Sequence, residues 1–253
     1  MSLKLPNFFV RKGYIDDIQN YSLSSLDLQI AREALKSDID AFIVNGLISF
    51  SSAINSLNKN NYSWSFIQCY YSLFYFARAF IGLNDYAIVY KESKPYGIKI
   101  QPSSGFIKLK GNSHDVVLSQ FKKHFSSDIL LSNNIDGLSP IDWFNKNRNF
   151  INYTLNPQTD PIPPIDLFDY KNEIRKWLVT YASDSVHTYT FDSNHCYLAY
   201  PFQVFLRIYN YYSENENTVE FLDEERFDYL KRNFSDDKGP ITSMITKIND
   251  LCV

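Results

Sequence analysis

The stretch that most constrains the fold is "WSFIQCYYSLFYFARAFI", residues 64–81, because its large apolar side chains recur with helical spacing. Five of its residues are spaced four, four, three and four positions apart, as on one face of an α-helix: Phe66, Tyr70, Phe74, Ala77 and Ile81. The other faces are also largely apolar, which is typical of a helix inside a large core. We therefore expect a buried helix over residues 62–82.

A membrane span is the alternative interpretation of this stretch. Such a helix needs about 20 predominantly apolar residues, whereas Ser65, Gln68, Ser72 and Arg78 interrupt this one. The N-terminus also lacks the long apolar core of a secretion signal. We therefore expect a cytoplasmic protein that has no membrane segment.

Motif spacing predicts neither a metal site nor a cofactor. The three cysteines stand far apart with no CxxC pair, which favours a reducing compartment and no zinc. The chain has no phosphate-binding glycine loop, no HExxH and no GxSxG.

Composition favours a mainly α protein. Hydrophobic residues make up 45% of the chain and aromatic residues 17%, which excludes an intrinsically disordered protein. Only 8 of the 253 residues are glycine, few for a dinucleotide-binding fold or for a sandwich with many tight turns.

The N-terminal part is predicted to contain an irregular segment and then helix. Residues 1–23 show no helical pattern, and "NFFV" is expected to be a short strand or coil. From Ser24 an amphipathic pattern with a polar start predicts a helix. We expect this helix to break near Asn45–Gly46 and to resume as far as about Leu57.

An insertion and two further helices are expected to complete the helical domain, which spans residues 24–156. Residues 86–111 contain short pieces rich in Tyr, Ile and Lys, which predict strands or extended loops. A helix with Ser113 as its N-cap follows. Another begins at "SPID", where Ser139 is the N-cap and Pro140 the first helical residue.

The rest of the chain is predicted to be a connector and a helical C-terminal region. Residues 157–164 are rich in proline, which indicates a stiff linker. Residues 165–253 are expected to form helices around 167–183 and 197–212 and two acidic helices at the end.

The helix predicted at 139–155 carries an unusual polar stripe. At 3.6 residues per turn one narrow face holds Asn145, Arg148, Asn149 and Asn152. Asn is a mediocre helix former, and an ordinary solvated face would use Glu, Lys or Gln. The opposite face is expected to point into the core, and it holds Trp143, Asn147, Phe150 and Ile151.

Two interpretations of the stripe are open. The stripe has no acidic residue to pair with Arg148, so it donates hydrogen bonds and carries positive charge, as a phosphate-binding surface does. Alternatively, it is a polar interface between helices in which Arg148 meets an acid from elsewhere in the chain.

The order of these segments resembles the HEPN family of helical domains. The matching pieces are "NNYSWSFIQCYYSLFYFARAFI", "NSHDVVLSQFKKHF" and "DWFNKNRNFINY", and they cover roughly residues 30–156. The resemblance implies an antiparallel helical bundle that pairs with a second copy through the motif helix. It also implies metal-independent RNA cleavage in a toxin or antiphage-defence system. In that family Arg and His surround the scissile phosphate while the 2′-hydroxyl of the RNA attacks.

The resemblance maps catalytic positions onto Arg148, Asn149 and Tyr153. Arg148 and Asn149 match the first two motif positions, but the expected His is replaced by Tyr153, Thr154 or Leu155. A phenol is a poor proton shuttle at neutral pH. The alternatives to the missing His, if folding brings one of them near, are His114, His187 and His195.

Basic residues outside the stripe complete the predicted RNA-binding surface. Between Lys91 and His124 there are seven lysines against two acidic residues, which is typical of a surface that follows a phosphate backbone. The predicted RNA-contacting residues, beside Asn145 and Asn152, are Lys108, Lys110, His114, Lys122 and Lys123. A solvated lysine-rich loop is the alternative interpretation.

Three functions are therefore open. The first is an RNA-binding or RNA-cleaving HEPN-like homodimer. The second is a non-catalytic HEPN module that dimerises or docks on a protein partner or antitoxin, which the missing His and the acidic C-terminal region favour. The third is a sensor of a small phosphate-bearing ligand in a polar pocket between helices.

Overall fold

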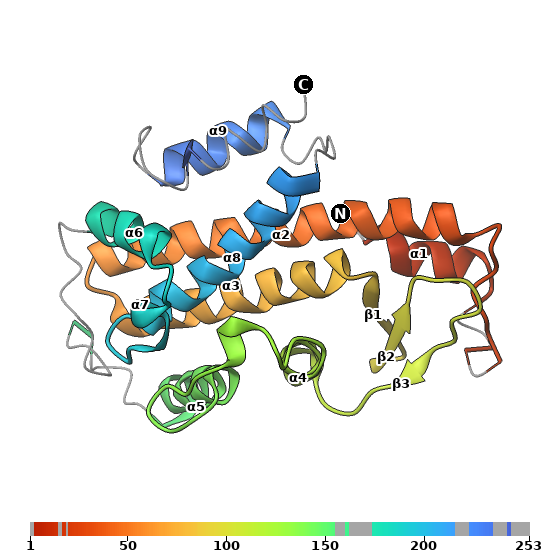
Figure 1. Cartoon of the computed structure of the whole chain (residues 1–253), viewed down its shortest axis with the longest axis horizontal. Coiled ribbons are helices and arrows are strands. Elements are labelled where there is room, and N and C mark those ends of the chain that lie inside the picture. Colours follow the sequence, from red (N-terminus) through yellow and green to blue (C-terminus); the bar gives the residue numbers. More distant parts are fainter. Residues whose placement is uncertain are drawn as a thin grey trace. The chain divides into compact units, whose positions relative to one another are not determined.

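The computed structural model describes residues 3–14, 17–18, 20–154, 160–161, 174–215, 223–234 and 242–243. It confirms a mainly α protein with one small sheet (Figure 1). The chain divides into two compact units, the first formed by Met1–Ile43 with Ala77–His124 and the second by Val44–Phe76 with Phe125–Val253. Among the described helices, none has the length and apolar character that crossing a membrane requires.

Two long helices, α2 (Leu28–Asn58) and α3 (Tyr62–Leu83), run antiparallel through both units. All five residues of the predicted apolar stripe on α3 are buried, which confirms the buried helix: Phe66, Tyr70, Phe74, Ala77 and Ile81. Ser65 and Ser72, which interrupt the apolar stretch, are also buried, and their hydroxyls find hydrogen-bond partners on α2. Ser65 Oγ donates to the Ala53 carbonyl at 2.9 Å and Ser72 Oγ to the Gly46 carbonyl at 3.0 Å.

The predicted break at Asn45–Gly46 is wrong, since α2 is continuous there. Gly46 is needed for close packing, because a Cβ atom at this position would lie 2.4 Å from Cε1 of Phe76. The sequence shows the glycine, but the aromatic ring that needs its space lies 30 residues away in the chain.

The first unit adds α1 (Lys4–Arg11), α4 (Ser113–His124) and an antiparallel sheet in the order β1 (Tyr86–Lys91), β2 (Lys94–Lys99), β3 (Ile107–Lys108). The strands confirm the predicted insertion of short extended pieces. The helix predicted after it is present, but its N-terminal amides are capped by Asn112 Oδ1, at 3.1 Å from the nitrogens of His114 and Asp115, so Ser113 is not the cap.

The helix α1 corrects the prediction of an irregular segment with a short strand at "NFFV". Its first amides are satisfied by a distant side chain, since the Asp38 carboxylate accepts hydrogen bonds from the backbone nitrogens of Lys4 at 2.6 Å and Leu5 at 3.1 Å. Asp38 is 4% exposed, and its burial raises the pKa of the carboxyl group above the ordinary value. No local pattern in the first residues encodes this cap.

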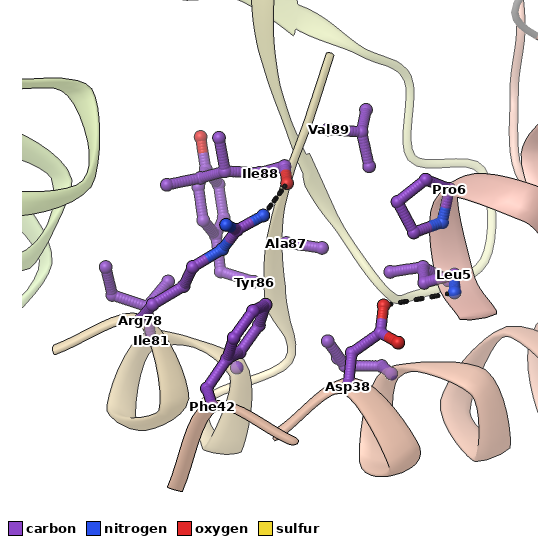
Figure 2. Close-up of a pocket in the computed structure, with 12 residues that line it drawn as sticks. Leu5, Pro6, Asp38, Phe42, Arg78, Ile81, Tyr86, Ala87, Ile88 and Val89 are labelled. Carbon is purple, nitrogen blue, oxygen red and sulfur yellow. Dashed lines mark hydrogen bonds between the residues drawn. The ribbon is translucent and has the colours of Figure 1, made fainter. Parts of the chain in front are cut away.

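Asp38 lines a small pocket on the first unit together with Arg78 (Figure 2). The Arg78 guanidinium lies 4.3 Å from the centroid of the Phe42 ring and donates to the Ile88 carbonyl at 3.3 Å. The pocket has a volume of about 20 Å³, which is room for about one water molecule. Its two charged residues therefore serve to hold α1 and β1 against the helix pair.

The second unit adds η1 (Ile129–Leu131), α5 (Pro140–Tyr153), α6 (Ile174–Ser183), α7 (Thr188–Phe191), α8 (Cys196–Asn215) and α9 (Glu224–Asn233). Aromatic rings fill its core. The Phe66 ring of α3 stacks on Phe144 of α5 at 5.8 Å and on Tyr197 of α8 at 6.4 Å between centroids. These helices agree with the predicted ones at 139–155 and 197–212.

Part of the predicted C-terminal organisation lies outside the described residues. Of the connector predicted at 157–164, only Asp160 and Pro161 are described, and Asp160 Oδ1 accepts from the Ser63 amide at 3.2 Å near the start of α3. The helix predicted from about residue 167 is described from Ile174. The last acidic helix falls almost wholly on residues that the structure does not describe.

Replacing Gly46 by alanine is expected to destabilise the protein. Forced repacking around Phe76 costs about 1–3 kcal/mol, while the better helix propensity of alanine returns at most ~1 kcal/mol. Urea unfolding measures the difference. Asn45→Ala, at an exposed neighbouring position, should be neutral or slightly stabilising, and adding Phe76→Leu to Gly46→Ala should recover stability. A Gly46→Ala protein as stable as wild type would contradict the packing argument.

A second prediction concerns Asp27. Its carboxylate forms a salt bridge with Lys12, with Nζ at 2.8 Å, and accepts a hydrogen bond from the Tyr14 hydroxyl. These two partners lower the pKa of Asp27 from 3.8 to about 2. Because the folded-state pKa is depressed, the stabilisation is present above about pH 4 and is lost as the pH falls through about 2. Asp27→Asn should therefore lower the free energy of unfolding near neutral pH.

Urea unfolding of wild type and the Asp27→Asn variant across this pH range tests the assignment. The gap between the two proteins should close as the pH falls toward about 2. Asp85→Asn, which changes an exposed carboxylate, should show little effect at any pH. A gap that is independent of pH would show that the loss comes from something other than the Asp27 charge.

Candidate functional site

The start of α5 is encoded locally, as the sequence predicted. Ser139 Oγ accepts a hydrogen bond from the Asp142 amide at 3.3 Å, and Pro140 occupies the first turn. The helix ends at Tyr153, and Thr154 is its C-cap.

Buried residues fix the rotation of α5 about its axis. Phe144 lies between Phe66 and Tyr200, with ring centroids 5.8 and 5.7 Å apart. Its neighbour Trp143 is also buried and donates from Nε1 to Asp136 Oδ2 at 3.1 Å. Two adjacent anchored aromatic residues leave a helix only one orientation, so the polar stripe has a defined direction.

The stripe itself divides into a supporting and an exposed part. Asn145 is half-buried and accepts a hydrogen bond from the Tyr70 hydroxyl of α3 at 3.0 Å. Asn149 and Asn152 are exposed, and Tyr153 is 77% exposed. Asn145, one of the residues predicted to contact RNA, therefore joins α5 to α3 through its side-chain oxygen.

Arg148 is held by aromatic rings and an amide. Its guanidinium carbon lies 5.5 Å from the centroid of the Tyr70 ring and 6.0 Å from that of Tyr153, which is within the range of a cation–π interaction. Nη1 donates to Asn149 Oδ1 at 3.1 Å. Within the described part of the chain Arg148 forms no ion pair, and its Nε is buried without a hydrogen-bond partner.

The prediction that Phe150 faces the core is wrong, because its side chain is 40% exposed. The buried side of α5 consists of Pro140, Ile141, Trp143, Phe144 and Ile151. Phe150 lies about 20° beyond Trp143 around the helix, so it falls at the edge of this side, in the last turn of α5. With Tyr153 it lines a shallow surface hollow whose other residues are Lys146, Asn147, Asn149 and Thr154.

The predicted basic residues belong to the other compact unit. Lys108 is in β3, Lys110 follows it, and His114 is half-buried in the first turn of α4. Lys122 and Lys123 are exposed in the last turn of α4, where cations complement the helix carbonyls. The stripe on α5 belongs to the second unit.

The other two histidines have local roles in the second unit. His195 is buried among the rings of Trp177, Tyr181 and Tyr189, its Nδ1 lies 3.0 Å from the Tyr181 hydroxyl, and burial lowers its pKa. His187 lies at the start of α7 with Nδ1 3.3 Å from Thr190 Oγ1, and burial lowers its pKa as well. Neither is among the described contacts of Arg148.

Sequence reasoning missed Tyr70 as part of the site. Its position in the buried stripe of α3 gave no sign that the ring also supports a cation and that the hydroxyl bonds to the stripe. Only the packing of α5 on α3 brings these groups together.

No family model matches the chain, and neither a curated protein nor a solved structure matches it.

Tyr70→Phe should lower the free energy of unfolding by about 0.5–1.5 kcal/mol, because it removes the donor to Asn145 from a buried position. Tyr153→Phe is the matched control, since it removes a hydroxyl from an exposed ring and should change stability by less than about 0.5 kcal/mol. Urea unfolding compares the two. Equal losses of stability in both variants would contradict the assignment of the Tyr70–Asn145 hydrogen bond as a stabilising link between α3 and α5.

Proposed function

We propose that the chain is a HEPN-like RNA-binding protein that acts as a metal-independent endoribonuclease of a toxin or antiphage-defence system. The observation that carries the proposal is the state of Arg148. Its half-buried side chain is supported by Tyr70 and Asn149, and within the described residues no carboxylate neutralises it.

An oxyanion would complete the environment of this side chain. A half-buried cation without a counter-ion has lost part of its hydration, and it regains an electrostatic partner when a phosphate binds. The planar guanidinium also matches two phosphate oxygens at once. The ring contacts hold the side chain before binding, which reduces the entropy lost on association.

Aromatic and amide side chains exposed on α5 favour single-stranded RNA as the source of that phosphate. Phe150 and Tyr153 are exposed aromatic residues three positions apart on the helix, and every base can stack on such rings. The amides of Asn149 and Asn152 can bond to sugar hydroxyls or base edges. Lys146 adds a positive charge beside Phe150 in the same hollow.

In a cleavage reaction Arg148 would stabilise negative charge on the phosphoryl oxygens as the 2′-hydroxyl of the RNA attacks. Tyr153 occupies the first position expected for the family His, and its ring lies 6.0 Å from the guanidinium carbon. It can donate a hydrogen bond to a phosphate. Proton transfer at neutral pH would need the RNA, solvent or a group of a second copy, and pairing through α5 would supply the last.

The second candidate is a non-catalytic HEPN module that dimerises or docks on a larger complex. One observation favours it. The described contacts of Arg148 are Tyr70, Asn149 and Tyr153, and phenols and amides do not exchange protons readily near pH 7. The exposed Phe150 and Tyr153 would then contact the partner protein.

Arg148→Ala is expected to weaken binding of a single-stranded RNA oligonucleotide at least about tenfold, because a hydrogen bond to a charged group is worth about 1.5–3 kcal/mol. The dependence of binding on salt should fall by about one phosphate contact. Arg148→Lys should recover only part of the affinity, since an ammonium lacks the planar fork. Arg32→Ala, at an exposed position of α2, is the control.

The same proteins, incubated with total RNA in EDTA, test cleavage. Loss of one charge-stabilising group should slow it by about 10²–10³-fold. If RNA binding depends on Arg148 but no RNA is cleaved, and if wild type and Arg148→Ala have the same molar mass by light scattering, the non-catalytic module is supported. RNA binding that is identical in wild type and Arg148→Ala would overturn the assignment of Arg148 as the phosphate contact.

A further inference from the structure

A second group of cationic side chains meets at one end of the sheet in the first unit. Tyr86 is the first residue of β1 and pairs in register with Lys99, the last residue of β2. His124, the last residue of α4, packs its ring on Tyr86 with 4.3 Å between centroids. Lys123 precedes it. Three chain segments therefore bring two lysines, a histidine and a phenol together.

The position of the Tyr86 ring is built into the sheet. A Cβ atom on Gly97 would lie 1.8 Å from the Tyr86 hydroxyl oxygen, so the ring crosses β2 where a glycine leaves space. The ring is buried, and burial raises the pKa of its hydroxyl. His124 thus rests on a fixed platform, although its own side chain is exposed.

The charges around His124 lack a described counter-ion. Lys99 and Lys123 are exposed, and within the described residues neither forms an ion pair. Burial against Tyr86 and the positive charges of Lys123 and Lys99 lower the pKa of His124. The carbonyl end of α4 accounts for a lysine in its last turn, but it does not explain Lys99, which comes from β2.

The acidic residues of this part of the chain are occupied elsewhere or exposed. Glu92 lies 3.9 Å from Lys94, and Asp115 accepts from Asn112 at 2.6 Å at the opposite end of α4. Asp85, which precedes Tyr86, is exposed and forms no described ion pair. The cluster therefore has an excess of positive charge.

We propose that Lys99, Lys123 and His124, supported by Tyr86, form a binding site for a backbone phosphate of RNA. The two ammonium groups attract the phosphate, and the imidazolium form of His124 donates a hydrogen bond to it. This inference rests on the proposed RNA-binding function and adds a contact in the first unit. Lys99 is one of the seven lysines that the sequence assigned to a surface following the phosphate backbone, whereas His124 and Tyr86 were not among the predicted RNA-contacting residues.

The site gives RNA binding a dependence on pH. In the protein without RNA, the charges of the neighbouring lysines disfavour protonation of His124. A bound phosphate offsets their positive charge and therefore favours protonation of the imidazole. If the phosphate raises the pKa of His124 by about one unit, affinity grows by up to about tenfold as the pH falls through the titration range of His124. Binding therefore strengthens in mild acid and weakens above neutral pH.

The test measures binding of a single-stranded RNA oligonucleotide by fluorescence anisotropy between about pH 5.5 and 8. Wild type should bind several-fold more tightly at the acidic end, and His124→Gln should abolish most of this difference. Lys99→Ala should weaken binding at every pH, by about threefold to tenfold for one phosphate contact. Lys36→Ala, which removes an exposed lysine of α2, should change neither the affinity nor its dependence on pH.

A second measurement follows the His124 ring by NMR, assigned by its absence in His124→Gln. The RNA should raise the pKa of this ring in wild type and in Arg148→Ala. A response to inorganic phosphate but not to RNA would show a site for free anions and would overturn the RNA assignment. RNA binding that is insensitive to both His124→Gln and Lys99→Ala would overturn the site itself.

The two proposals can fail separately. If Arg148→Ala binds RNA as wild type does while the His124 response persists, the α5 proposal fails and the cluster stands. If Arg148→Ala loses binding while His124→Gln and Lys99→Ala have no effect, the cluster fails and the α5 proposal stands.

Discussion

The packing of α5 on α3 is the constraint on which the candidate site depends. Phe144 stacks against Phe66, and with the buried Trp143 it fixes which side of α5 points away from the core. Tyr70 of α3 belongs both to the core and to the candidate site. Its ring belongs to the core stripe of α3, while the same ring lies under the Arg148 guanidinium. The half-buried cation of α5 is therefore positioned by packing against an aromatic ring rather than by an opposite charge.

Two other cations of the described chain pair with carboxylates, and they give a comparison for Arg148. Lys12 lies 2.8 Å from Asp27 in the first unit, and Arg207 lies 3.3 Å from Asp128 in the second. Arg148 has rings and an amide instead of such a partner within the described residues. A partly dehydrated cation of this kind costs stability unless something else compensates it. The proposed phosphate contact would supply that compensation.

Local signals in the sequence predicted the elements, and long-range packing decided what they could not. The apolar period of α3 and the Ser139 cap of α5 act within a few residues, so both helices were predictable. The α1 helix was not, because its cap is Asp38. The helix break predicted at Gly46 is wrong, because the Phe76 ring that requires a glycine at this position is remote in sequence. The stripe was predictable from periodicity, but the ring beneath it and the exposure of its neighbours depend on how α5 packs.

Each compact unit is assembled from two separate stretches of the chain, and α2 and α3 both pass from one unit to the other without interruption. No single cleavage of the backbone separates the two units, since a fragment that keeps both stretches of one unit also keeps a stretch of the other. Neither surface can be isolated by trimming the ends of the protein. A recombination, evolutionary or in the laboratory, that exchanges either unit for another must therefore replace two stretches of the chain and join the new sequence inside both α2 and α3.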